Sequence, residues 1–524
     1  MGDARIAILV GLAAGCLIAC GPSGDGGGNP GTGGGAAGTT GAAGAGGAGG
    51  AGATTGGGGS TAGTSGAAGT TGAGGAAGVG GTTGSAGTGG ASAGTGGSGA
   101  TAGTGGATAG TGGGMSGRGG GSAGTGGASG RGGTTGAGGT GGTGGGGTQP
   151  WVGTWATGPQ LTETGNNPPD PPGLTNNTLR QIVYTSISGS QVRLRLSNEF
   201  GNGPVTMNAV HVALSTTGGT INTSTDKAVT FSGAASVTIP QNQAVFSDPF
   251  AFALPALGKV AITIAFGSTP SGITGHPGSR TTSYLATGNM VSAATLSGAM
   301  TAEHWYYIVG LDVMAPAGTA AVVTLGDSIT DGRGSTTDVN NRWPDVFSRR
   351  LQANAATMGK VAVLNQGIGG NAVLTGGLGP TAQARFMRDV LQMRGVKWLI
   401  VFEGVNDLGG SSSGATTAQQ LITAYGSFVD MAHAMGIKAY GATITPLGML
   451  YYNADRDAGR NMVNTWIRTS NKFDAVIDFD MAVRDPADAS KMLGTYDSGD
   501  GLHPSVAGHQ KLADTVDLAL FANP

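Results

Sequence analysis

Four short segments in the C-terminal part of the chain carry side chains that can act together in catalysis. They are Gly326–Gly332 (GDSITDG), Gly367–Asn371 (GIGGN), Gly404–Asp407 (GVND) and Asp500–Pro504 (DGLHP). Together they supply a hydroxyl nucleophile, a backbone donor, an amide donor and an acid–histidine pair, which are the groups that acyl transfer from an ester requires. Any one segment is a weak signal, but four in this order indicate one catalytic site.

Each group has a definite role in such a site. Ser328 is the predicted nucleophile, and His503 is the base that accepts its proton. Asp500, three residues before His503, is placed to hold the second imidazole nitrogen and to stabilise the imidazolium. The negative oxygen formed by attack needs fixed donors, and we expect the backbone amides of Ser328 and Gly370 and the side-chain amide of Asn406 to supply them.

Structural alternatives exist for several of these residues. Ser328 is also a typical helix cap, and Asn406 with the next residue is a typical turn pair. His503 and His509 together suggest a metal, but no cysteine or carboxylate cluster accompanies them. We therefore expect no metal and no cofactor. The absence of a G-x-S-x-G segment around Ser328 disfavours the α/β-hydrolase class.

Other polar residues of these segments are expected to organise loops or the fold. Asp327, Asp331 and Asp407 are interpreted as loop organisers rather than general acids. His276 and Arg180, further upstream, are expected to have structural roles.

The elements around the four segments alternate between apolar strands and amphipathic helices. This pattern predicts a parallel sheet covered on both faces, whose sites gather at the carboxyl ends of the strands. Ser328, Gly370 and Asn406 each follow a predicted strand and should meet on one rim. The predicted strands are 321–325, 361–365, 398–402, 438–443 and 475–479, and the predicted helices are 343–353, 381–393, 418–435, 455–471 and 506–521.

The preceding residues, 150–316, are predicted to form an all-β accessory domain, a sandwich or jelly roll. Residues 191–196 alternate polar and apolar side chains, and residues 259–266 form another candidate strand. Short strands separated by Gly-rich turns, without helical periodicity, favour this class. Residues 317–524 then form the catalytic domain.

The four segments resemble those of the SGNH (GDSL-type) hydrolase family. The resemblance covers Ala320 to the C-terminus and implies a three-layer α/β/α, flavodoxin-like fold and the site Ser328, Gly370, Asn406, Asp500 and His503. More loosely, the segments 177–181, 276–280 and 342–345 resemble a bacterial subgroup with an N-terminal β-domain, similar to esterases associated with xylan degradation. That subgroup implies O-acetyl groups on polysaccharides as substrates.

Two other functions are compatible with the sequence. One is a broad arylesterase or lipase for short acyl chains. The other, of a different class, is an inactive carbohydrate-binding protein at the cell surface, which the intact serine, histidine and amide donors disfavour.

The N-terminus predicts export as a lipoprotein. An apolar run from Ile6 to Ala19 follows Arg5, and Leu17–Cys20 resembles a lipobox, so residues 1–20 are interpreted as a signal segment with Cys20 as the lipidated residue. The resemblance implies an outer-membrane or cell-surface location, with the membrane as a partner through the anchor.

A Gly-, Ala-, Thr- and Ser-rich segment, 21–149, follows the lipobox and is expected to be a disordered linker, because it has almost no large apolar side chains to bury. With a net charge of −2, the chain shows no sign of nucleic-acid binding.

Overall fold

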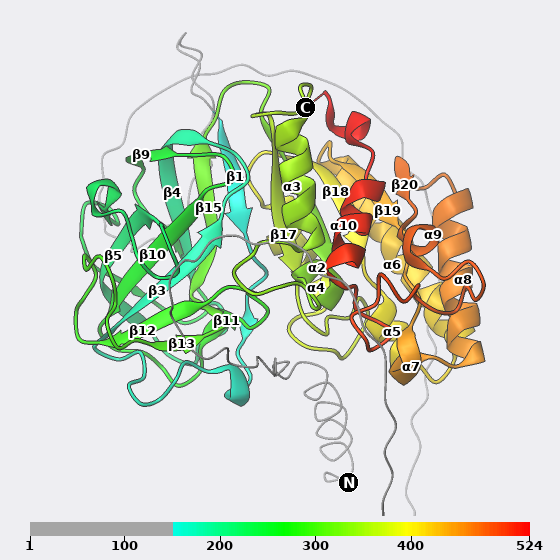
Figure 1. Cartoon of the computed structure of the whole chain (residues 1–524), viewed down its shortest axis with the longest axis horizontal. Helices are drawn as coiled ribbons and strands as arrows, with labels where there is room; N and C mark the ends of the chain where they lie inside the picture. Colours follow the sequence, from blue (N-terminus) through cyan, green and yellow to red (C-terminus); the bar gives the residue numbers. More distant parts are fainter. Residues whose placement is uncertain (1–149, 524) are drawn as a thin grey trace, which may run out of the picture. The chain divides into compact units, whose positions relative to one another are not determined.

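The computed structural model describes residues 150–523 (Figure 1). The predicted signal segment, Cys20 and the Gly-rich linker lie outside the described residues. Within residues 150–523, no helix is long and apolar enough to cross a membrane.

Residues 151–314 form an all-β region in which every strand pair is antiparallel. Its strands make two larger sheets, in the orders β1-β15-β4-β8 (with β9 beside β4) and β13-β12-β3-β10-β5-β6 (with β7 beside β5), and a small sheet β14-β11-β2. The strands are β1 (Trp151–Ala156), β2 (Gln160–Leu161), β3 (Asn177–Tyr184), β4 (Gly189–Ser197), β5 (Val205–Leu214), β6 (Lys227–Val229), β7 (Val237–Ile239), β8 (Ala244–Phe246), β9 (Phe250–Leu254), β10 (Lys259–Phe266), β11 (Thr274–His276), β12 (Ser283–Thr287), β13 (Met300–Ala302), β14 (Trp305–Tyr306) and β15 (Ile308–Met314), with the short helices η1 (Thr164–Asn166) and η2 (Thr223–Thr225).

Residues 320–521 form an α/β region around a five-stranded parallel sheet in the order β17-β16-β18-β19-β20. The chain leaves β16 toward β17 on one side and then toward β18 on the other, so the strand order reverses beside β16. The elements are β16 (Ala320–Gly326), α2 (Ser328–Asp331), α3 (Trp343–Ala353), β17 (Val361–Gly367), α4 (Ala382–Phe386), η3 (Met387–Leu391), β18 (Val396–Phe402), α5 (Val405–Gly409), α6 (Gly414–Ala434), β19 (Lys438–Ala442), α7 (Gly448–Tyr451), α8 (Ala454–Thr469), β20 (Ala475–Ile477), α9 (Phe479–Val483), α10 (Val506–Thr515) and η4 (Leu518–Phe521).

The two faces of the parallel sheet bury alternate side chains, as the period of a β-strand requires. On β16, Val322 belongs to the apolar cluster that includes residues of α3, α9 and α10. Its neighbour Val323 belongs to the cluster that includes residues of α6 and α8. Figure 1 shows α3 and α10 together over one face of this sheet. The predicted fold class is therefore confirmed: a three-layer parallel α/β/α region preceded by an antiparallel all-β region.

The β region and the α/β region share one apolar cluster. Trp155 of β1 and Leu364 of β17 both belong to it, and a Cβ on Gly153 would lie 3.0 Å from the Leu364 side chain. The amide of Val363 donates to Ser186 Oγ at 3.1 Å, across the two regions. The described residues cluster as one compact unit, and the predicted boundary after residue 316 stays a prediction.

Candidate active site

Ser328 lies at the sharp turn between β16 and α2. The Asp327 side chain caps α2 by accepting from the amide of Ile329 at 2.9 Å. Ser328 is the first residue of the helix, where a backbone N–H has no partner within the helix. Two glycines permit the close packing of this turn, since a Cβ on Gly326 would lie 2.0 Å from Thr330 Oγ1 and one on Gly367 would lie 2.2 Å from the amide nitrogen of Asp331.

The structure brings Ser328, His503 and Asp500 together although 172 to 175 residues separate the serine from the other two. Ser328 Oγ lies 2.8 Å from His503 Nε2, and His503 Nδ1 lies 2.6 Å from Asp500 Oδ2. Ser328 and His503 are almost fully buried, at 6% and 4% exposure. With Asp500 accepting from the Nδ1–H, Nε2 is left as the base that faces the serine hydroxyl.

Asp500 is held in its charged form. Burial alone favours the neutral acid, but the hydrogen bond and electrostatic interaction with His503, together with backbone donation from His503 and Leu502, outweigh burial and lower the pKa of Asp500 well below its ordinary value. The two backbone amides donate to Oδ1 at 2.8 Å and 3.0 Å. The Oδ2 atom is thereby left to the imidazole.

The expected oxyanion donors follow three neighbouring strands at their carboxyl ends. Ser328 follows β16, Gly370 follows β17 and Asn406 follows β18. Gly370 has a φ of +69°, a left-handed conformation that favours glycine. A Cβ there would also lie 3.1 Å from Leu378.

The amide of Asn406 is fixed at both ends. Its Nδ2 donates one hydrogen to the carbonyl of Asn371 at 2.7 Å. Its Oδ1 accepts from the hydroxyl of Tyr451 at 3.1 Å. Since Nδ2 carries two hydrogens, the second remains for a substrate oxygen. The sequence did not predict Tyr451, because no local pattern links α7 to the GVND segment.

Arg385, on α4, connects the strand ends beneath these donors. Its guanidinium donates to the carbonyls of Gly326 and Gln366, at 3.0 Å and 2.6 Å, and to Asn371 Oδ1 at 3.0 Å. It also pairs with Glu403, at the carboxyl end of β18, at 3.1 Å. Arg385 and Glu403 are fully buried. No local sequence pattern indicates this network, because Arg385 lies in a predicted amphipathic helix where arginine is common.

Asp327 and Asp407, two of the three aspartates interpreted as loop organisers, accept hydrogen bonds from backbone amides. Asp327 caps α2, as described. Asp407 accepts from the amides of Val373 and Leu374, both at 2.9 Å, and so holds the chain that follows the GIGGN segment.

Asp331, on α2, contacts the β region. Its Oδ1 lies 2.8 Å from His276 Nε2, and both side chains are buried. His276 Nδ1 donates to the carbonyl of Gly158 at 2.9 Å, and its ring stacks on Trp305 with centroids 5.7 Å apart. His276 thus joins the β region to the helix that carries Ser328, which is a structural role.

Arg180 makes its hydrogen bonds within the β region, to Thr263, Gly219, Ala293 and Ala294. These hydrogen bonds indicate a structural role for Arg180 as well.

His509 has both ring nitrogens engaged by backbone groups. Nδ1 accepts from the amide of Trp343 at 3.2 Å, and Nε2 donates to the carbonyl of Arg333 at 3.0 Å. Burial lowers the pKa of His509 to about 4, so the ring is neutral. Within residues 150–523 no cluster of three His, Cys, Asp or Glu side chains is arranged to hold a metal ion.

Two buried carboxyls behind Ser328 have raised pKa values. Burial, and next the charge of Asp407, raise the pKa of Asp327 to about 7, against the opposing hydrogen bond from Ile329. Burial, and next the charge of Asp327, raise the pKa of Glu403 well above its ordinary value. Asp327 therefore keeps its proton at pH values at which the unfolded chain has released it.

A pH-dependent stability follows for Asp327. Between its ordinary pKa of 3.8 and about 7, the folded protein keeps a proton on this carboxyl that the unfolded chain loses. The free energy of unfolding therefore falls as pH rises through this window. We expect Asp327→Asn, which keeps the capping oxygen, to raise the melting temperature at pH 8 relative to the parent, and to raise it less at pH 4.

The matched control is Asp517→Asn, the same substitution at an exposed cap, where Asp517 accepts from the amide of Ala519 at 2.9 Å. If the two variants shift the melting temperature equally at pH 4 and at pH 8, the buried carboxyl of Asp327 does not make stability depend on pH.

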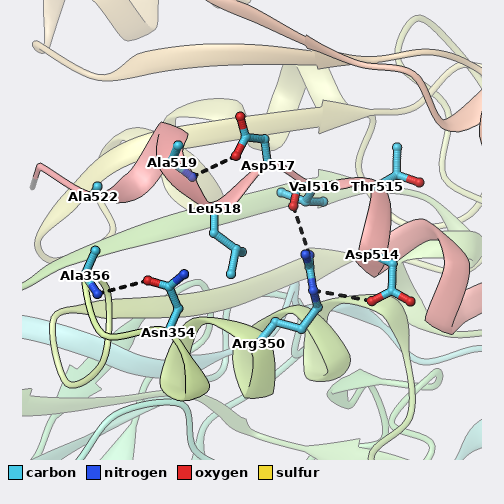
Figure 2. A pocket seen from close by; sticks show the side chains of 10 residues that line it. All are labelled: Arg350, Asn354, Ala356, Asp514, Thr515, Val516, Asp517, Leu518, Ala519 and Ala522. Carbon is cyan, nitrogen blue, oxygen red and sulfur yellow. Dashed lines mark hydrogen bonds and ion pairs between the residues drawn. The ribbon is translucent and has the colours of Figure 1, made fainter.

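One hollow among the described residues lies away from this site. It measures about 680 Å³ and lies between the C-terminal ends of α3 and α10, near Arg350 and Asp514 (Figure 2). The Arg350 guanidinium already donates to the carbonyl of Val516 at 2.9 Å and pairs with Asp514 at 3.3 Å. Ser328 lies instead at the carboxyl end of the sheet.

Comparison with known proteins agrees with the geometry of the site. Residues 324–511 match the model of the GDSL-like Lipase/Acylhydrolase family. The matched range contains all four segments. This part of the chain is a GDSL-like acylhydrolase domain, and the enzyme class it carries is that of the carboxylic ester hydrolases.

Similar solved structures include an acetylxylan esterase from Geobacillus stearothermophilus, at 20% identity over 39% of this chain and 95% of that chain, with a TM-score of 0.30. Another is a GDSL-like lipase from Bacteroides thetaiotaomicron, at 18% identity over 38% of this chain and 87% of that chain, with a TM-score of 0.28. At these identities and TM-scores the similarity says nothing about substrate. Comparison with curated proteins finds no match.

Proposed function

We propose that the GDSL-like domain hydrolyses carboxylic esters through an acyl-enzyme on Ser328. The observation that supports this most strongly is the continuous chain of contacts from Ser328 Oγ to His503 Nε2 at 2.8 Å and from His503 Nδ1 to Asp500 Oδ2 at 2.6 Å. A serine hydroxyl is a weak nucleophile until a base accepts its proton, and this arrangement supplies the base and fixes its tautomer.

The reaction has two halves. Ser328 Oγ attacks the ester carbonyl carbon while His503 Nε2 takes the hydroxyl proton. The tetrahedral intermediate then collapses, the C–O bond to the alcohol breaks, and His503 gives its proton to the departing alkoxide. In the second half, water attacks the acyl-enzyme with His503 again as base, which releases the carboxylic acid and restores the Ser328 hydroxyl.

Charge develops on the former carbonyl oxygen in both halves. We assign the amides of Ser328 and Gly370 and the Asn406 side chain as its donors. In related chemistry, losing one such donor lowers kcat by roughly 10²–10³-fold.

For the substrate, we propose O-acetyl groups on polysaccharides such as xylan. This rests on the resemblance of the upstream segments to a subgroup of xylan-associated esterases. The test is acetate release by the purified protein from a panel of acetylated glycans, compared with p-nitrophenyl esters of increasing chain length.

Glycan deacetylation that exceeds aryl ester hydrolysis in kcat/KM supports the proposal. Activity that grows with acyl length and is absent on glycans identifies a broad arylesterase or lipase instead. Glycan binding without any ester turnover identifies the inactive carbohydrate-binding protein.

We further propose export and attachment to an outer membrane or cell surface through a lipid on Cys20. The residue lies outside the described part of the structure, so the proposal rests on the lipobox-like segment alone. Membrane-fractionated protein should carry an acyl mass at the N-terminal cysteine that Cys20→Ala lacks. An unmodified, freely secreted parent protein would rule out the anchor.

A further inference from the structure

We infer that Tyr451 is a positioning residue for the oxyanion donor Asn406, and that the short helix α7 is therefore part of the catalytic apparatus. This inference rests on the proposed function, because it assigns to Tyr451 the task of orienting one of the donors proposed above. Tyr451 touches Asn406 and acts through it.

The chain of contacts begins in the rigid interior. Arg385 donates to Asn371 Oδ1 at 3.0 Å, and Asn371 Nδ2 donates to the carbonyls of Leu378 and Pro380, both at 2.8 Å. Every polar atom of the Asn371 side chain is thus engaged, so its backbone carbonyl has a fixed position. That carbonyl accepts from Asn406 Nδ2 at 2.7 Å.

The Asn371 carbonyl decides which end of the Asn406 amide faces it, because a carbonyl accepts and never donates. One contact still leaves the amide free to rotate about it. The hydroxyl of Tyr451 supplies the second contact by donating to Oδ1 at 3.1 Å. Two contacts at opposite ends fix the plane of the amide, and with it the direction of the second N–H.

The Tyr451 hydroxyl also strengthens the donor. A hydrogen bond to the amide oxygen polarises the amide and makes its N–H a better donor in a site of low dielectric. This benefit grows when the bound oxygen becomes negative, so it acts mainly in the transition state.

The Tyr451 ring is itself held in place by the GVND helix. A Cβ on Gly409 would lie 2.3 Å from the Tyr451 ring, so the ring packs directly on the backbone of α5. At the first residue of α7, a Cβ on Gly448 would lie 2.8 Å from the carbonyl carbon of Gly501 and from Leu502, the residue before His503. Helix α7 thus contacts both the segment with the amide donor and the segment with the histidine.

Tyr451→Phe provides the test, with p-nitrophenyl acetate as substrate. We expect kcat to fall about tenfold, the value of one well-placed hydrogen bond, with KM changed less than twofold. Tyr452→Phe removes the same hydroxyl from the next residue, which is 46% exposed, and should leave kcat and KM unchanged. Gly409→Ala, which displaces the Tyr451 ring without altering Tyr451, should lower kcat as Tyr451→Phe does.

A double-mutant cycle separates positioning from a merely structural role. In the Asn406→Ala background, Tyr451→Phe should have no further effect on kcat, because the group it positions is gone. A tenfold fall in that background as well, or full activity of Tyr451→Phe in the parent, overturns the inference.

Failure of the inference and failure of the proposed function give different results. If Asn406→Ala loses about 10²-fold in kcat while Tyr451→Phe loses nothing, only the role of Tyr451 is wrong. If Asn406→Ala keeps full kcat, the proposed oxyanion site is wrong, and the role of Tyr451 falls with it.

Discussion

Ser328→Ala is expected to lower kcat for p-nitrophenyl acetate by roughly 10⁶-fold, the loss seen when the nucleophile of another serine–histidine–aspartate site is removed. The variant loses the atom that attacks the ester, and His503 then has no hydroxyl to deprotonate. Steady-state hydrolysis assays at saturating substrate measure the fall in kcat. The fold should remain intact, since the substitution removes one oxygen at the edge of the sheet.

Thr324→Ala is a matched control for Ser328→Ala. It removes a hydroxyl from the same strand-to-helix segment, where Thr324 Oγ1 donates weakly to the carbonyl of Leu364 at 3.4 Å. It should retain most of the activity. If Ser328→Ala has a circular dichroism spectrum and melting temperature like those of the parent and keeps its activity, the acyl-enzyme mechanism is wrong.

Arg385→Met is expected to lower the free energy of unfolding by about 3–5 kcal/mol, because it removes a buried guanidinium that donates to Asn371, Gln366 and Glu403, and each buried acceptor left unsatisfied costs about 1–3 kcal/mol. It also removes the guanidinium hydrogen bonds to the carbonyls of Gly326 and Gln366. Chemical denaturation, followed by the midpoint and slope of the transition, measures the loss.

Lys472→Met is the control for the loss of a cation. Lys472 pairs with Asp430 at 2.5 Å, but the two side chains are 35% and 67% exposed, so the expected cost is below about 1 kcal/mol. The double variant Arg385→Met/Glu403→Leu should recover part of the stability that Arg385→Met loses, since no uncompensated carboxyl remains. No recovery, or a cost for Arg385→Met as small as that of Lys472→Met, would contradict the account of this network.

Elements with a regular apolar or amphipathic pattern could be predicted from the sequence. Strand β10 has the predicted bounds of 259–266, and helix α3 has the predicted bounds of 343–353. The predicted helix 381–393 is instead divided into α4 and the π-helical turn η3.

Short strands such as β1 and β9 were not predicted. Trp151–Ala156 contains a glycine and no clear alternation, and its strand state depends on pairing with β15, more than 150 residues away in sequence. Propensity alone does not determine such strands, because their stability comes from neighbours across the sheet.

The candidate site residues could be predicted because their residue types are restricted. Serine, histidine and aspartate at a given spacing have few other uses, and Gly370 is required by its positive φ. Tyr451 and Arg385 act through contacts between distant segments, and each has a residue type that is common on any helix. Only the structure shows that Tyr451 reaches Asn406 and that Arg385 joins three strand ends.

The most direct test of the central claim is covalent labelling of Ser328. A fluorophosphonate reacts by attack of the serine oxygen on phosphorus with loss of fluoride, and mass spectrometry of the digested protein locates the adduct. We expect one adduct per chain, on the peptide that contains Ser328, and strongly slowed labelling in His503→Ala. An active enzyme that takes up no label on Ser328, or that is labelled equally fast without His503, would contradict the central claim.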